Sequence, residues 1–105
     1  MQEADEWITC RIAFTEVARA LRLAGGSDRP LIAEWPGFAV VDVDQALCES
    51  ATTLATLHRL RTLDALHLAA ALTVADVGLT LAAWDRRLWD AATQVGLAVL
   101  PGERP

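Results

Sequence analysis

The hydrophobic residues of this chain fall into two kinds of pattern that alternate along it. Apolar positions at helical spacing predict helices over residues 11–23, 45–57, 63–74 and 86–95, with one helical turn over 30–35. Short, nearly continuous apolar runs predict strands over residues 7–10, 38–43, 79–84 and 97–100. Asp44 is placed to cap a helix, as is Thr62, and Gly78 and Gly96 are placed to end helices.

Strands that alternate with helices predict an α/β fold. Crossover connections of this kind give a parallel sheet with helices on both faces. The strand over residues 79–84 is expected to be buried, since it is apolar almost throughout. In such sheets ligands bind beyond the carboxyl ends of the strands. With 105 residues, the chain is expected to form one domain over residues 1–105.

Composition narrows the functional classes. Hydrophobic residues make up 53% of the chain, which is enough for a core and argues against disorder. No apolar run is long enough for a membrane span, and the acidic start lacks the profile of a secretory signal, so we expect a cytoplasmic protein without a membrane. A net charge of -5 argues against a general electrostatic nucleic-acid binder but leaves room for a local basic rim. All nine basic residues are arginine, which suits phosphate contacts but equally fits a genome-wide composition bias.

Three acidic residues interrupt apolar segments. Glu16 lies in the apolar stripe of the first helix, Asp64 opens an almost wholly apolar helix, and Asp85 directly follows the third strand. A buried lone carboxylate is costly and usually neutralises or binds a cation. Several carboxylates at one sheet edge are typical of a site for a hard divalent cation, which can activate water for attack on a phosphodiester.

Each acid also has a structural explanation. Asp64 is at a position that the helix macrodipole favours, and Asp85 can cap the next helix while it binds a ligand. Glu16 can pair with Arg19 or Arg22. His67 either orients Asp64 by a hydrogen bond or is an ordinary core histidine. Cys10 and Cys48 lack the spacing of a zinc site, and we expect two buried thiols.

The three acidic segments together resemble the PIN-domain family, in particular the VapC-type ribonuclease toxins. Residues 8–17, with Glu16, resemble the family's second strand and the helix after it. Residues 60–69, with Asp64, are the most specific match, and residues 84–88 contain the acid Asp85. The order and spacing of all three segments agree with the family, so the resemblance covers nearly the whole chain.

The resemblance implies a three-layer PIN-like fold and an endoribonuclease dependent on Mg2+ or Mn2+. Glu16, Asp64 and Asp85 would hold the metal and carry catalysis. The arginines that flank these acids would contact RNA phosphates: Arg11, Arg86 and Arg87. The implied partners are an RNA substrate, a cognate antitoxin and a second copy of the chain. Trp7 and Trp89 are candidates for the dimer face.

The chain departs from the family pattern at its start. Family members begin with a central strand that carries the first metal-binding aspartate, whereas this chain begins at the second strand, so we expect an N-terminally truncated domain with unpaired strand edges. A fragment or mis-assigned start, a decayed toxin, or completion of the sheet by another chain would each explain the difference. The alternative function is therefore a non-catalytic module that binds an antitoxin or itself. A metal-dependent phosphatase is a third, weaker alternative.

Overall fold

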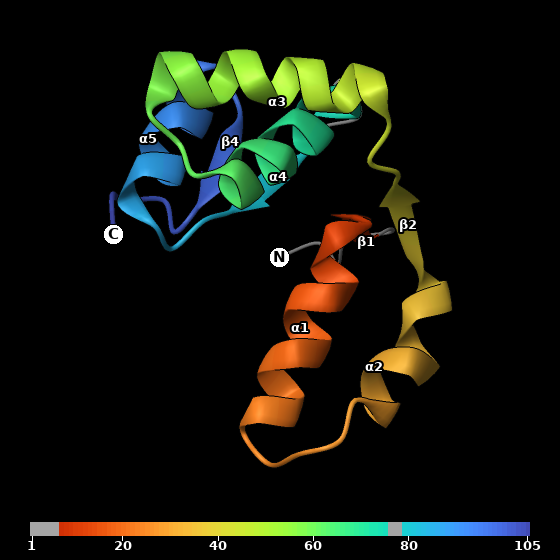
Figure 1. Cartoon of the computed structure of the whole chain (residues 1–105). Coiled ribbons are helices and arrows are strands. Elements are labelled where there is room, and N and C mark those ends of the chain that lie inside the picture. The colour runs from red at the N-terminus through yellow and green to blue at the C-terminus, as the bar shows by residue number, and fades with distance from the viewer. Residues whose placement is uncertain (1–6, 76–78) are drawn as a thin grey trace. The chain divides into compact units, whose positions relative to one another are not determined.

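The computed structural model describes residues 7–75 and 79–105, and the side chains within them from Thr9 onward (Figure 1). The chain divides into two compact units, residues 1–43 and residues 44–105. Each unit has its own parallel pair of strands: β1 with β2 in the first, and β3 with β4 in the second. The predicted α/β class with parallel strands is confirmed, and the described strands form two two-stranded sheets instead of one continuous sheet.

The first unit consists of β1 (Trp7–Cys10), α1 (Ile12–Leu23), α2 (Arg29–Glu34), the 3-10 helix η1 (Trp35–Gly37) and β2 (Phe38–Val41). These bounds lie within two residues of the predicted ones, because each helix begins where the apolar period changes from two to three or four. The ring of Trp35 contacts Phe14 edge-on at 5.1 Å and Phe38 at 5.6 Å, measured between ring centroids. This aromatic cluster joins α1 to β2.

The second unit consists of α3 (Gln45–His58), α4 (Thr62–Thr73), β3 (Thr80–Ala82), α5 (Arg86–Gln94) and β4 (Ala98–Leu100). Helix α3 packs against α4, and α5 packs against both α4 and β4 (Figure 1). Among the described residues, none of these helices is long and apolar enough to cross a membrane.

Most of the buried side chains belong to the second unit and are small. Six apolar residues of α4 are buried, and one of them, Leu68, is completely buried. Ala91 and Ala92 of α5 are buried to the same degree. Alanines at these positions let the helix backbones approach closely, and a single large side chain such as Leu68 fills the remaining space. The core of this unit therefore fixes the ends of α4 and α5, where the candidate site lies.

Two of the four predicted features at helix ends are confirmed. Asp44 caps α3, with its Oδ1 accepting a hydrogen bond from the backbone N–H of Leu47 at 2.8 Å. The prediction that Thr62 caps α4 is wrong: α4 begins at Thr62, and its N-cap residue is Arg61, which makes no side-chain capping bond. Gly96 follows α5 with a φ of 87°, a conformation that glycine adopts without strain. The predicted helix end at Gly78 lies outside the described residues.

The expected buried strand over residues 79–84 is also wrong. Strand β3 covers only Thr80–Ala82, and two of its three residues are exposed. Ala83, which follows it, is buried and donates its backbone N–H to the carbonyl oxygen of Leu100 at 2.8 Å. An apolar run predicts burial on both faces, but among the described strands β3 pairs only with β4. Burial here therefore depends on the neighbouring strand and not on the composition of the run.

Candidate functional site

A pocket of about 480 Å³ lies within the second unit and holds two of the three predicted acids. Its lining consists of Arg61, Asp64, Trp84, Asp85, Arg86 and Arg87. These residues come from the N-terminal ends of α4 and α5 and from the segment that follows β3. The carboxyl end of a parallel strand and the N-termini of two helices thus meet at one place, as expected for a ligand site in an α/β sheet.

Asp85 caps a helix through a bond that uses only one of its carboxylate oxygens. It is the N-cap of α5, and its Oδ1 accepts the backbone N–H of Leu88 at 3.0 Å. The capping bond uses one oxygen and fixes the carboxylate at the pocket, so Oδ2 remains for a ligand. The expectation that Asp85 caps the next helix is confirmed. It does not directly follow the third strand, because β3 ends at Ala82, two residues before Trp84 and three before Asp85.

Asp64 lies in the first turn of α4 and is half-buried. The next two residues of α4, Ala65 and Leu66, are both buried, so Asp64 lies at the edge of the core. No charged side chain in the described part of the chain is buried, and Asp85 is exposed. Both carboxylates therefore lie at a pocket instead of inside the core.

Glu16 belongs to the first unit. It lies in α1 and is half-buried, and Ala18 two positions later is the buried residue of that helix. The pocket of the second unit accordingly contains two of the three predicted acids, Asp64 and Asp85. Among the described residues, no three histidine, cysteine or acidic side chains come close enough together to hold a metal ion. Two carboxylates still fit Mg2+, which commonly uses one or two and completes its shell with water and phosphate oxygens.

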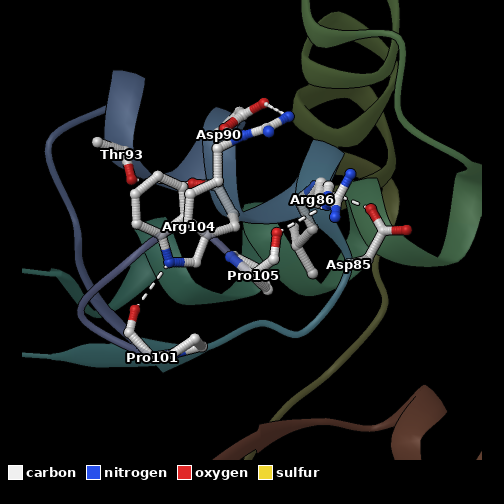
Figure 2. A network of polar contacts seen from close by, with 9 residues as sticks. Asp85, Arg86, Asp90, Thr93, Pro101, Arg104 and Pro105 are labelled. Atoms are coloured by element: carbon white, nitrogen blue, oxygen red, sulfur yellow. Dashed lines mark hydrogen bonds and ion pairs between the residues drawn. The ribbon is translucent and has the colours of Figure 1, made fainter.

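The predicted RNA-binding arginines have different surroundings. Arg11 pairs with Asp42 in the first unit, Nε to Oδ1 at 2.7 Å, with both side chains largely exposed. Arg86 donates its Nε to the carbonyl oxygen of Pro105 at 2.7 Å, so its guanidinium is held at the pocket by the end of the described chain (Figure 2). Arg87 is exposed at the pocket.

A segment that we call the C-terminal strap, residues 101–105, lies along α5. Arg104 forms two hydrogen bonds with the carboxylate of Asp90, at 2.8 and 3.1 Å, and the indole N–H of Trp89 donates to the carbonyl oxygen of Pro101 at 2.8 Å (Figure 2). The hydrogen bond from Arg104 lowers the pKa of Asp90, and that bond in turn raises the pKa of Arg104. The strap thereby contacts α5 at the pocket residue Arg86 and again at Trp89 and Asp90.

Comparison with known proteins identifies the family. The sequence model of the PIN domain matches residues 1–93. This chain belongs to the PIN domain family. It is similar to two curated proteins of Mycobacterium tuberculosis: Ribonuclease VapC45 of strain CDC 1551 / Oshkosh and Ribonuclease VapC49 of strain ATCC 25618 / H37Rv. Each is 34% identical over 110 aligned residues, which cover 94% of this chain and 76% of the relative. No solved structure gives a significant match. The resemblance described from the sequence is thus confirmed.

Two pocket residues of this PIN domain were not predicted from the sequence. Arg61 lies between the helices predicted over residues 45–57 and 63–74, three residues before Asp64. Trp84 was assigned only to the end of a strand, although it directly precedes Asp85. A residue adjacent to a strand-end acid shares its position at the sheet edge, and that position was the available signal.

The structure also places the cysteines, His67 and one of the tryptophans named from the sequence. Cys10 is buried as expected, but Cys48 is exposed on α3, so the prediction of two buried thiols is half wrong. His67 is half-buried on α4. Trp89, a candidate for a dimer face, is half-buried and bound to Pro101, while the side chain of Trp7 lies outside the described part of the chain.

Proposed function

We propose that this PIN domain is an endoribonuclease toxin of a type II toxin–antitoxin pair that depends on Mg2+ or Mn2+. The observation that carries the proposal is the pocket in which Asp64 and Asp85 lie beside three arginines. Oxygen ligands for a hard cation next to guanidinium groups for phosphates suit a phosphodiester substrate. The names of the two relatives, both ribonucleases, support RNA as the substrate class.

A bound divalent cation would lower the pKa of a water molecule and neutralise charge on the phosphate. The two aspartates would hold that cation, and Oδ2 of Asp85 is the oxygen that its capping bond leaves available. The arginines would orient the phosphodiester by hydrogen bonds to its non-bridging oxygens. Hydrolysis adds the water oxygen to phosphorus and breaks the bond to the leaving ribose oxygen, which takes up a proton.

Glu16 is the third residue of the proposed catalytic and metal-binding set. Its assignment rests on the order of the acidic segments that the chain shares with the PIN domain family. The family match runs over residues 1–93 and so includes both compact units. We accordingly propose that residues 1–105 act as one domain, in which Glu16 acts with Asp64 and Asp85.

The proposed partners follow from the same assignment. They are an antitoxin protein that blocks the pocket, and a second copy of this chain, acting in the cytoplasm. Exposed apolar side chains on the first unit support a protein partner, since Val17, Leu23 and Ile32 are 44%, 69% and 53% exposed.

The nuclease proposal is tested by comparing Asp85→Asn with Asp44→Asn. Both residues cap a helix through Oδ1, and asparagine caps as well as aspartate, so both variants should fold and lose one charge. Of these two aspartates, Asp85 lines the pocket and Asp44 does not. We expect cleavage of a single-stranded RNA with Mn2+ to fall at least a hundredfold in Asp85→Asn, as ~3 kcal/mol of lost transition-state stabilisation implies, and to persist in Asp44→Asn. Equal activity of the two variants would contradict the proposal.

The rival function is a non-catalytic module that binds an antitoxin or itself. The observation in its favour is that the pocket of the second unit brings together two carboxylates and not three. Calorimetric titration of the whole chain with Mn2+, beside an Asp64→Ala variant, separates the two functions. Binding that is lost in the variant supports the nuclease. Absence of binding by both folded chains supports the module.

A further inference from the structure

Trp84 is the most exposed of the tryptophans whose side chains the structure describes. It is 75% exposed, although tryptophan is usually well buried in folded proteins. Trp35 packs between Phe14 and Phe38, and Trp89 donates its indole N–H to Pro101. Within the described residues the indole of Trp84 makes neither kind of contact. Its large apolar face is therefore available to a ligand.

The backbone on both sides of Trp84 is fixed. Ala83 is buried, and its N–H is bound to the carbonyl oxygen of Leu100 at 2.8 Å. Asp85 is the cap of α5, bound to Leu88 at 3.0 Å. One residue between two such anchors loses little further backbone freedom when its side chain binds a ligand, which lowers the entropic cost of binding.

The surroundings of Trp84 indicate what its ligand is. It lines the pocket with two carboxylates and with Arg61, Arg86 and Arg87. A wholly apolar ligand would remove water from these charged groups without offering them a hydrogen bond. A ligand with a flat aromatic face beside an anionic group satisfies both kinds of neighbour. A nucleobase with its adjoining phosphate has this combination.

We propose that Trp84 is a stacking platform for an unpaired nucleobase of RNA next to the phosphodiester held by the acids and arginines. This inference rests on the proposed function for the identity of the ligand as RNA. A base inside a duplex is stacked on its neighbours on both faces, so only an unpaired base offers its face to the indole. The site thus selects single-stranded RNA or loops over helical RNA.

The test measures binding of a fluorescein-labelled single-stranded RNA of mixed sequence to the full chain without divalent cations, by anisotropy. Removal of one base–aromatic stack weakens binding roughly ten- to a hundredfold. We expect that loss for Trp84→Ala, a much smaller loss for Trp84→Phe, which keeps an aromatic face, and none for Leu57→Ala. Leu57 is the matched control, because it is 71% exposed at the end of α3 and does not line the pocket.

A second readout uses the ligand instead of the protein. For the wild-type chain we expect a fully duplex form of the same RNA to bind more weakly than the single strand. We also expect the Trp84→Ala change to leave duplex binding unaltered. Unchanged single-strand binding by folded Trp84→Ala would overturn the proposal, as would a wild-type chain that binds no RNA.

Cleavage with Mn2+ separates this inference from the nuclease proposal. Trp84-dependent binding without cleavage supports the stacking platform and contradicts the nuclease. Cleavage with the same KM in wild type and Trp84→Ala supports the nuclease and overturns the platform. If Trp84→Ala keeps its RNA affinity but loses self-association in sedimentation experiments, Trp84 is a protein contact and the platform is likewise overturned.

Discussion

Arg104 donates two hydrogen bonds to the carboxylate of Asp90, Nε to Oδ1 at 2.8 Å and Nη2 to Oδ2 at 3.1 Å. The pair joins the C-terminal strap to α5, one helical turn beyond Arg86, which binds the carbonyl oxygen of Pro105 (Figure 2). A bidentate contact between guanidinium and carboxylate fixes orientation as well as distance. The strap therefore connects a surface ion pair to an arginine of the candidate site.

The first prediction concerns release of the strap. In Arg104→Ala, hydrogen exchange of the Trp89 indole N–H, which donates to the carbonyl oxygen of Pro101, should speed up. The core amides of α4 should keep their protection, since an exposed ion pair contributes little to global stability. Asp90→Asn should have the same effect. The charge-swapped double variant Asp90→Arg/Arg104→Asp should restore slow exchange. Fast exchange in wild type would contradict a closed strap.

The second prediction concerns pH. The pKa of Asp90 is below its ordinary value because of the hydrogen bond from Arg104. A carboxylate with a lowered folded-state pKa contributes stability above its unfolded pKa, and loses that contribution as the pH falls through the folded value. The strap should thus stay closed from neutral pH down to the ordinary aspartate range near 3.8 and open only below it.

The measurement for this second prediction is an NMR titration of the Asp90 carboxyl carbon. In Arg104→Ala we expect the pKa of Asp90 to rise toward its ordinary value. An identical titration in both chains would show that Arg104 does not cause the shift.

The third prediction tests the core that positions the pocket. Leu68 is completely buried in α4 between the alanines of the packed helices. Leu68→Ala should lower the free energy of unfolding by about 2–5 kcal/mol, from lost burial and the cavity left behind. Leu57→Ala removes the same atoms at a position that is 71% exposed, and should change stability by less than about 0.5 kcal/mol. Chemical denaturation measures the free energy of unfolding of both variants. Equal losses in the two would contradict the prediction.

The contrast between Asp44 and strand β3 shows what the sequence could predict and what it could not. Asp44 follows an apolar strand and precedes an apolar helical period, and local chemistry alone makes it a cap, which the structure confirms. The helices were likewise predictable from the spacing of their apolar residues. The burial of strand β3 could not be predicted in this way. It depends on which strand lies beside β3, and that is a long-range property.

The candidate site was predictable in part for the same reason. Asp64 and Asp85 stood out as charges within apolar segments, and they line one pocket. Trp84 and Arg61 gave no such signal, because an apolar residue in an apolar run and an arginine in a polar connector both fit their surroundings. Only the meeting of α4, α5 and the end of β3 makes them pocket residues.

The fourth prediction uses the turn between α3 and α4. Arg59 caps α3 with a φ of 55°, in the left-handed region that costs a residue with a Cβ about 1 kcal/mol. Arg59→Gly should raise the free energy of unfolding by up to about 1 kcal/mol. Arg59→Ala loses the same charge but keeps the Cβ, and should gain nothing. A rise in both variants would assign the effect to the lost charge instead of the backbone.

The fifth prediction concerns phosphate contacts. Arg86 and Arg87 both line the pocket, and each phosphate that a guanidinium neutralises releases counterions from the RNA. For a single-stranded RNA, the slope of log K against log salt should therefore become shallower by about 1.4 in Arg86→Ala/Arg87→Ala, or about 0.7 for each lost contact.

The control for this double variant is Arg29→Ala/Arg59→Ala, which loses the same two charges at exposed positions outside the pocket. Its salt slope should stay close to that of the wild-type chain, because long-range attraction between exposed charges is screened within about 10 Å at 0.1 M salt. Matching slopes for the two double variants would mean that net charge, and not contact at the pocket, sets the affinity for RNA. A shallower slope in the pocket variant alone would place the phosphates beside Asp64 and Asp85, where hydrolysis requires them.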